Sequence, residues 1–379
     1  MRHCSRRLGY PLMVMALVLA ASAPMSTASA ARSADPSPPR PWVKICLKLK
    51  LMPAHRRIKC HFPPAPRAAS AARFDGEARL GGKVRQAPTI TELTIPTSPS
   101  TPVGITAGPD GALWFTENYA NKIGRVTTSG LFTEYTLPTS GAEPAHITVG
   151  PDGALWFTEA NANKIGRITT SGTITEYTVP TADSYPWGIT VGPDDALWFV
   201  EVEGNKIGRI TTSGTITEYP LPTADVYPLH IAAGPDGNLW FTESLGNSIG
   251  QITPSGTITE FTVPTSGATP IGITAGPDGN LWYTDANGYV SSVSTTGTFT
   301  EYALTDPNSY PWGITVGPDD NLWFTEQSAN IIASVTTSGT IDEYTLPTNV
   351  SGPFEVALGS DDNLWVTEDY VDQIAVVTP

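Results

Sequence analysis

Short runs of alternating apolar and polar residues, separated by glycine-containing turns, fill the chain from residue 88 to its end. One stretch illustrates the pattern. Residues 147–149 form a run that ends at Gly-Pro-Asp-Gly, and residues 155–159 (Leu-Trp-Phe-Thr-Glu) follow. Residues 164–169 and 174–179 add two more runs with a Ser-Gly turn between them. Runs rich in β-branched and aromatic residues, bounded by turn residues, predict four β-strands.

This unit of four runs recurs along the chain, and its period indicates the fold. A tryptophan marks the second run of each copy, and successive tryptophans are 42 residues apart except for one step of 41: Trp114, Trp156, Trp198, Trp240, Trp282, Trp323 and Trp365. Four strands in a repeat of this length are typical of a propeller blade. No helical period of 3.6 residues competes within the repeats. The sequence therefore predicts an all-β fold, a seven-bladed β-propeller with four-stranded blades.

The two ends of the repeat region complement each other. The last copy stops after its third run, at residues 373–377. Residues 89–96 copy the fourth run of the second repeat, residues 173–180, although they precede the first tryptophan. We expect this N-terminal strand to complete the last blade and close the ring, which removes an exposed sheet edge. The predicted propeller domain is 88–379, and because a closed ring leaves little edge for association, we expect a monomer.

Two segments of different character precede the repeats. Residues 1–30 have a basic start, an apolar run and an Ala-Ser-Ala site, a pattern typical of a signal peptide, so we expect export to the periplasm or the cell exterior. The apolar run is too short for a stable span, and we predict no transmembrane segment. Residues 31–87 are basic and rich in proline and alanine, which favours a poorly ordered arm. Cys46 and Cys60 lie in this arm, and whether they pair is left open.

Charge divides sharply between the arm and the ring. Six of the 22 lysine and arginine residues lie in the predicted propeller, whereas only three of the 36 acidic residues lie outside it. An acidic ring repels nucleic acid and anionic membrane surfaces and attracts cations. We therefore expect no nucleic-acid partner. A solvated surface with a solvated tail would also account for this division.

An acidic residue ends the second run of every copy. A ring of carboxylates could bind a cation, but recurrence in all seven copies favours a structural role, as a partner for backbone N–H groups of the following loop. The residues are Glu117, Glu159, Glu201, Glu243, Asp285, Glu326 and Glu368.

One column of the repeat departs from its own pattern in a way that suggests chemistry. The first run, which should line the central channel, opens with Pro-x-Gly in most copies, and three copies replace this glycine by His146, His230 and Glu355. Two histidines and a carboxylate are the ingredients of a divalent-metal site or of an acid–base set. They could equally be polar residues that fill a wet channel. Whether they meet depends on the channel width, which the sequence does not specify.

Aromatic residues are frequent in the columns just before this one. Trp187, Trp312 and Phe354 precede the glycine column directly, and Tyr185, Tyr227 and Tyr310 lie two residues before that position in their copies. Exposed aromatic residues beside polar groups suit a flat small-molecule ligand. The same residues could instead pack between neighbouring blades. They are our candidate ligand-binding residues.

Whole repeats resemble the virginiamycin B lyase (streptogramin lyase) family over residues 88–379. The resemblance rests on three motifs: Gly-Ile-Thr-x-Gly-Pro-Asp-Gly-x-Leu-Trp-Phe-Thr-Glu, Asn-Lys-Ile-Gly-Arg-Ile-Thr and Ile-Thr-Glu-Tyr-x-x-Pro. It implies a seven-bladed propeller and a carbon–oxygen lyase that opens cyclic depsipeptides by elimination at an ester bond. It also implies a histidine base and Mg²⁺ held by glutamates.

The family's catalytic histidines directly follow proline in the last two blades. Here those positions hold Trp312 and Phe354, and the position of the glutamate before the last Pro-His corresponds to Gly352. No Pro-His occurs in this chain. The nearest counterpart is Glu143-Pro144-Ala145-His146, whose histidine comes one residue late. In a regular strand, one residue moves a side chain to the opposite face.

Two functions of different classes follow. In the first, an exported Mg²⁺-dependent lyase acts on a cyclic ester, with His146 or His230 as the base and Glu143 and Glu355 as metal ligands. In the second, a non-catalytic propeller binds a small molecule through its aromatic residues, or serves as a scaffold in the cell envelope or outside the cell.

Overall fold

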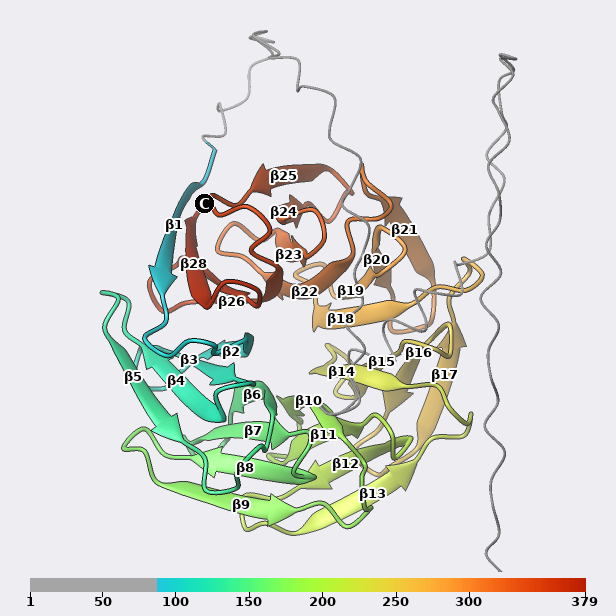
Figure 1. Ribbon diagram of the computed structural model, residues 1–379. Coiled ribbons are helices and arrows are strands. Elements are labelled where there is room, and N and C mark those ends of the chain that lie inside the picture. Colours follow the sequence, from blue (N-terminus) through green and yellow to red (C-terminus); the bar gives the residue numbers. More distant parts are fainter. Residues whose placement is uncertain (1–86) are drawn as a thin grey trace, which may run out of the picture. The chain divides into compact units, whose positions relative to one another are not determined.

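The computed structural model describes residues 87–379, which form seven four-stranded antiparallel sheets around a central axis (Figure 1). The seven-bladed propeller predicted from the sequence is confirmed. The predicted signal peptide, Cys46, Cys60 and nearly all of the predicted arm lie outside the described residues. Within the described part of the chain, no helix is long and apolar enough to cross a membrane.

The first strand of each blade is the innermost, because each packs against the first strands of both neighbouring blades. These strands are β2 (Pro102–Ala107), β6 (Pro144–Val149), β10 (Pro186–Val191), β14 (Pro228–Ala233), β18 (Pro270–Ala275), β22 (Pro311–Val316) and β26 (Pro353–Leu358).

The second strands are buried along their whole length. They are β3 (Leu113–Glu117), β7 (Leu155–Glu159), β11 (Leu197–Glu201), β15 (Leu239–Glu243), β19 (Leu281–Asp285), β23 (Leu322–Glu326) and β27 (Leu364–Glu368).

The third and fourth strands continue each sheet away from the axis. The third strands are β4 (Lys122–Val126), β8 (Lys164–Ile168), β12 (Lys206–Ile210), β16 (Ser248–Ile252), β20 (Tyr289–Val293), β24 (Ile331–Val335) and β28 (Gln373–Thr378). The fourth strands are β5 (Phe132–Thr136), β9 (Ile174–Thr178), β13 (Ile216–Pro220), β17 (Ile258–Thr262), β21 (Phe299–Ala303), β25 (Ile341–Thr345) and, for the last blade, β1 (Thr89–Thr94).

The ring closes through β1, as the sequence predicts. β1 pairs antiparallel with β28, from Thr89 opposite Thr378 to Thr94 opposite Gln373. Glu92 in β1 accepts hydrogen bonds from the backbone and hydroxyl of Thr348. The fourth-strand glutamate of other blades makes the same pair of contacts with a threonine of the preceding blade. The N-terminal strand therefore takes the structural place of a fourth strand.

The repeated tryptophan explains the turn sequence that precedes it. Trp156 is fully buried, stacks on Tyr177 with ring centroids 5.6 Å apart, and donates from Nε1 to Asp152 at 3.0 Å. A Cβ on Gly150 would lie 2.4 Å from the indole ring, so only glycine fits before the turn. The glycine and the aspartate of this turn recur in all seven blades, and the aspartate accepts from the tryptophan Nε1 in each, so the turn positions the main core residue of the blade.

Candidate functional site

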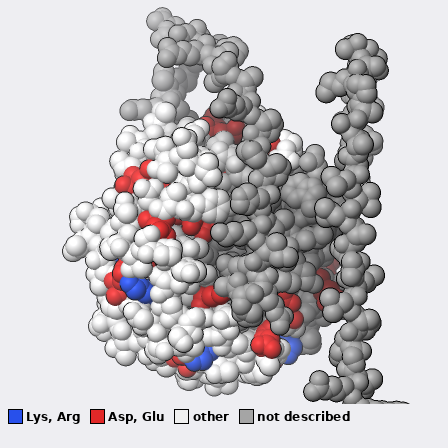
Figure 2. All heavy atoms as spheres, viewed as in Figure 1, with Lys and Arg blue, Asp and Glu red and all other residues white. Residues whose placement is uncertain are grey.

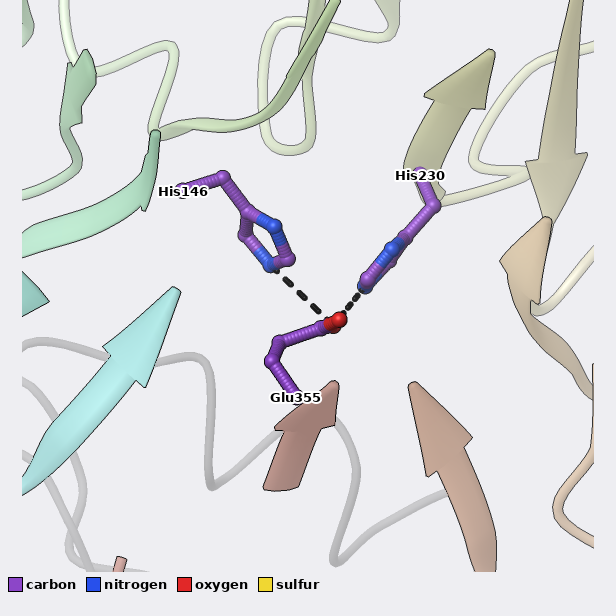
Figure 3. A group of neighbouring side chains, drawn as sticks. All are labelled: His146, His230 and Glu355. Atoms are coloured by element: carbon purple, nitrogen blue, oxygen red, sulfur yellow. Dashed lines mark ion pairs between the residues drawn. The ribbon is translucent and has the colours of Figure 1, made fainter. Parts of the chain in front are cut away.

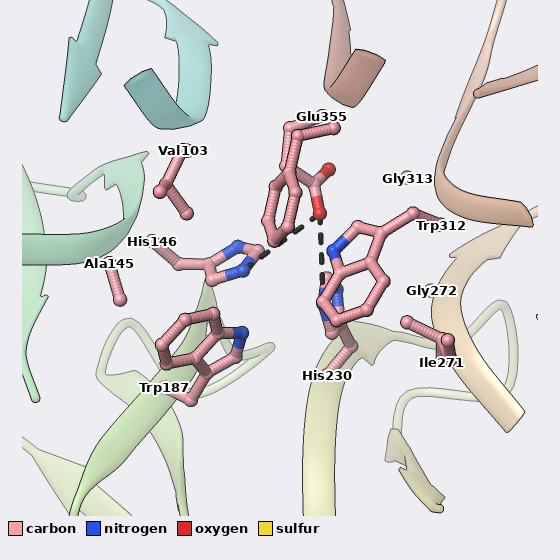
Figure 4. Close-up of polar contacts among 12 residues, drawn as sticks. Val103, Ala145, His146, Trp187, His230, Ile271, Gly272, Trp312, Gly313 and Glu355 are labelled. Carbon is pink, nitrogen blue, oxygen red and sulfur yellow. Dashed lines mark ion pairs between the residues drawn. The ribbon is translucent and has the colours of Figure 1, made fainter. Parts of the chain in front are cut away.

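An irregularity in the innermost strands determines which side chains face the axis. In β6, Pro144 pairs with Glu159 and Ile147 with Phe157, so two residues, Ala145 and His146, lie opposite the single residue Thr158. A bulge of this kind interrupts the alternation of faces. Consecutive residues can then both face the axis, as Figure 4 shows for Ala145 and His146. The expectation that a one-residue offset moves His146 to the opposite face is therefore wrong.

A threonine of the second strand links the bulge to the next blade in six of the seven blades. Thr158 Oγ1 accepts the backbone N–H of His146 at 3.1 Å and donates to the carbonyl of Trp187 in the next blade at 2.6 Å. Corresponding threonines link six of the seven junctions, and Val200 takes this place in the third blade. These threonines were not predicted, although the recurrence of Phe-Thr-Glu at the end of the second run is a usable sequence signal for a shared structural role.

The three ionisable residues of the glycine column converge at the axis (Figure 3). Glu355 Oε1 lies 3.8 Å from His146 Nε2 and 3.6 Å from His230 Nε2, and the two imidazole ring centroids are 4.4 Å apart. One potential ligand atom from each residue lies within 4.8 Å of the others. We call His146, His230 and Glu355 the axial cluster.

Glycines of the preceding blades leave room for this cluster. A Cβ on Gly104 would lie 2.8 Å from the Cα of His146, and one on Gly188 would lie 2.9 Å from the Cα of His230. A Cβ on Gly313 would lie 2.7 Å from Glu355 Oε2. A glycine in the blade before each of these three larger residues is thus a packing requirement of the narrow axis.

Burial keeps the axial cluster uncharged near neutral pH. Its side chains are only 10–12% exposed. Burial lowers the pKa of His146 to about 3, and it lowers the pKa of His230 well below the usual value, with His146 adding to the effect. Burial raises the pKa of Glu355 to about 8. Both imidazoles are therefore neutral at pH 7, and the carboxyl group is largely protonated.

All six predicted aromatic residues are buried. Figure 4 shows two of them, Trp187 and Trp312, beside the axial cluster. Trp187 lies beside His146 at 5.7 Å between ring centroids, and Trp312 lies beside His230 at 6.4 Å and Phe354 at 4.5 Å. Tyr185, Tyr227 and Tyr310 belong to the same apolar cluster, and each is 4–5% exposed. The structure thus shows the packing alternative for these residues, and a ligand role for them stays a prediction.

The axial cluster does not include Glu143, which was predicted to be a metal ligand. Glu143 precedes β6, is 8% exposed, and is not among the grouped ligand atoms. The cluster offers two nitrogens and one carboxylate, whereas Mg²⁺ prefers oxygen ligands. These donors therefore fit the Mg²⁺ implied by the resemblance poorly. Mg²⁺ binding and the metal role of Glu143 remain predictions.

The seven acids that end the second strands are almost wholly buried. Only Asp285 makes the expected contacts, with the backbone N–H groups of Thr269 and Asn287. Neither carboxyl oxygen of Glu117 or Glu159 has a hydrogen-bond partner. For these glutamates, the predicted role as partner of backbone N–H groups is wrong.

Comparison with known proteins gives the family. A sequence profile of the virginiamycin B lyase family matches residues 88–377. The chain belongs to the virginiamycin B lyase family. Virginiamycin B lyase from Staphylococcus aureus is 42% identical, with a TM-score of 0.74 over 77% of this chain and 99% of that one. A streptogramin B lyase structure is 40% identical at the same TM-score, over 77% of this chain and 97% of that one.

Two further groups of solved structures are similar to this chain, one closely and one in fold only. A catalytically inactive histidine-to-alanine form of the S. aureus lyase, solved with quinupristin, is 42% identical over 77% of this chain and 99% of that one, with a TM-score of 0.74. Extracellular domains of two-component systems from B. thetaiotaomicron are 17% and 15% identical. At that level of identity they share the fold alone.

Proposed function

We propose that this chain is an exported, non-catalytic small-molecule-binding propeller of the virginiamycin B lyase family. The carrying observation is the packing of Trp312 against Phe354 at 4.5 Å. These two residues occupy the positions of the histidines that the family resemblance makes catalytic, and they are 1% and 5% exposed. An indole and a phenyl ring can accept no proton, so the family's base is missing where it would be needed.

The described histidines do not replace that base readily. His146 and His230 are the only histidines among residues 87–379, and both point to Glu355 within the axial cluster rather than to an open surface. His230 in β14 is buried, whereas His146 in β6 and Glu355 in β26 are half-buried behind two buried residues. A general base must come within hydrogen-bond reach of the proton that it removes. Nε2 of His146 and Nε2 of His230 are inaccessible to solvent, so neither atom is presented to a substrate on the surface of the ring.

Binding is supported by likeness to the lyases. Identity of 40–42% spans nearly the whole length of those lyases, and one of them was solved with quinupristin. Binding energy and chemistry are separable in an enzyme, because the groups that hold a substrate need not be those that react. Loss of the base can therefore leave a binding protein.

Quinupristin tests this proposal directly. We expect isothermal titration calorimetry to show saturable binding, and mass spectrometry to show no linearised product after incubation with Mg²⁺. The S. aureus lyase serves as the positive control for turnover. Turnover by this chain would contradict the non-catalytic part, and absence of any binding heat or thermal shift would contradict the binding part.

A carbon–oxygen lyase that uses His146 or His230 is the second candidate, and the convergence of these residues with Glu355 favours it. Any turnover must then fall in His146→Ala or His230→Ala. Turnover that persists in the double variant would contradict this candidate.

A further inference from the structure

The axial cluster presents three buried polar atoms that lack partners. Nε2 of His146, Nε2 of His230 and Oε1 of Glu355 are inaccessible to solvent, and none of them has a hydrogen-bond partner. Buried polar atoms are nearly always hydrogen-bonded, so three such atoms that face one another call for a shared partner. Figure 3 shows both imidazole nitrogens directed at the carboxylate.

The separations suit one bound ion better than direct hydrogen bonds. The Oε1–Nε2 distances of 3.6 and 3.8 Å exceed the hydrogen-bond range. Ligand atoms about 2.0–2.2 Å from a tetrahedral ion lie about 3.4 Å from each other. The two Oε1–Nε2 separations are close to that value, and all three atoms lie within 4.8 Å of one another, so side-chain rotations would bring them to an ion at their centre.

The donor set selects the class of ion. Two imidazole nitrogens and one carboxylate oxygen are ligands for zinc, iron, cobalt and manganese, whereas magnesium and calcium take oxygen ligands. Three protein ligands leave a coordination position open. Trp187 Nε1 is a buried donor without a partner beside His146, and it suits a water molecule or anion in that position.

The surrounding structure holds the donors in place. Thr158 and Thr242 accept the backbone N–H groups of His146 and His230, and Thr367 accepts that of Glu355. The ring around the axis is acidic, and Figure 2 shows acidic side chains spread over the visible face with few basic ones. Such a surface raises the local concentration of cations.

We propose that His146, His230 and Glu355 bind one divalent first-row transition-metal ion on the propeller axis. This site goes beyond the proposed function, because it uses a different column of the repeat from the family's catalytic positions. It does not require that the ring bind quinupristin. Failure of either proposal therefore leaves the other standing.

Zn²⁺ binding to the full-length chain, freed of metal by chelation, tests the site. We expect calorimetry to show one Zn²⁺ site that Mg²⁺ does not occupy. Affinity at that site should fall at least about 100-fold in His146→Ala, His230→Ala and Glu355→Gln, because loss of a ligand exceeds the 10–100-fold cost of losing a residue that only orients one. Cobalt should give visible absorption bands that the same variants lose.

Residues 1–86 carry other potential zinc ligands: His3, His55, His61, Cys4, Cys46 and Cys60. The comparison of variants with the parent chain separates these from the axial site. Asp320→Asn is the matched control, because Asp320 is exposed and at least 35 residues from each of the three ligands in the sequence, and it should leave Zn²⁺ affinity unchanged. Circular dichroism and thermal melting without metal must show that each variant is folded.

Gly313→Ala gives a second test that keeps every ligand. The added methyl group would meet Glu355 Oε2 at 2.7 Å and displace the carboxylate. Zn²⁺ affinity should fall while the cobalt bands shift rather than vanish. Zn²⁺ binding that is unaltered in His146→Ala, His230→Ala and Glu355→Gln would overturn the proposal, as would equal affinity for Mg²⁺.

Discussion

Replacement of Glu159 by glutamine should stabilise the propeller at alkaline pH. Glu159 ends β7, is fully buried, and neither of its carboxyl oxygens has a hydrogen-bond partner. The nearby Lys164 does not neutralise it, because that ammonium group bonds to Glu176 and Thr139 at 2.6 Å each. Burial, with the charge of Glu176, raises the pKa of Glu159 from 4.5 to about 8.

The sign of the effect follows from this raised pKa. Between pH 4.5 and about 8, the folded chain keeps a proton at Glu159 that the unfolded chain releases. The free energy of unfolding contributed by this group is therefore complete below pH 4.5 and is lost as pH rises through 8. The pKa difference sets an upper bound of about 5 kcal/mol. Water that reaches the charged group reduces this, so we expect about 2 kcal/mol at pH 9.

Urea unfolding at pH 5 and pH 9 measures the effect. Glutamine has nearly the shape of the protonated acid, so Glu159→Gln should match the parent within about 1 kcal/mol at pH 5 and exceed it by about 2 kcal/mol at pH 9. Glu176→Gln is the control. Hydrogen bonds from Lys164 and Thr139 outweigh burial and lower the pKa of Glu176, so its loss should destabilise equally at both pH values. A Glu159→Gln difference that is the same at pH 5 and pH 9 would refute the reasoning.

Two further predictions concern packing and charge. Lys164→Met should lower the free energy of unfolding at pH 7 by about 1–2 kcal/mol, because it leaves the half-buried Glu176 carboxylate without its cation, and a shift in the urea midpoint measures this. High salt should not abolish the loss, since exposed pairs alone are strongly screened. Trp312→Ala should lower the free energy of unfolding by about 3–5 kcal/mol, because the indole is 1% exposed and packs on Phe354. A Trp312→Ala chain that melts like the parent but loses a ligand would instead show that the indole is a binding residue.

The fold could be predicted from the sequence because each blade repeats the same pattern of strands and turns. Trp156 and its counterparts each follow a turn of the form Gly-x-Asp-Gly or Gly-x-Asp-Asp, so one blade explains all seven. Closure was also visible, since residues 89–96 supply the one fourth strand that the last copy lacks. Such predictions need only local patterns and a count of copies.

The side chains at the axis were harder to place. Strand periodicity assigns alternate residues to opposite faces, and it therefore placed Ala145 and His146 on different sides. The register shift between Pro144 and Ile147 removes that alternation. The sequence hints at this register shift only through the proline that starts each innermost strand. That proline and the Pro-x-Gly pattern are compatible with a bulge but do not specify one.

Burial of the aromatic residues depends on the width of the ring. The same Trp187 would lie exposed at the rim of a wide channel and inside the core of a narrow one, and a single blade does not determine which. Glycines 104, 188 and 313 permit the innermost strands to approach so closely that a Cβ there would overlap the next blade. That approach brings His146 and Glu355 together. Departures from glycine in one column therefore bring ionisable side chains together only because the remaining glycines keep the axis narrow.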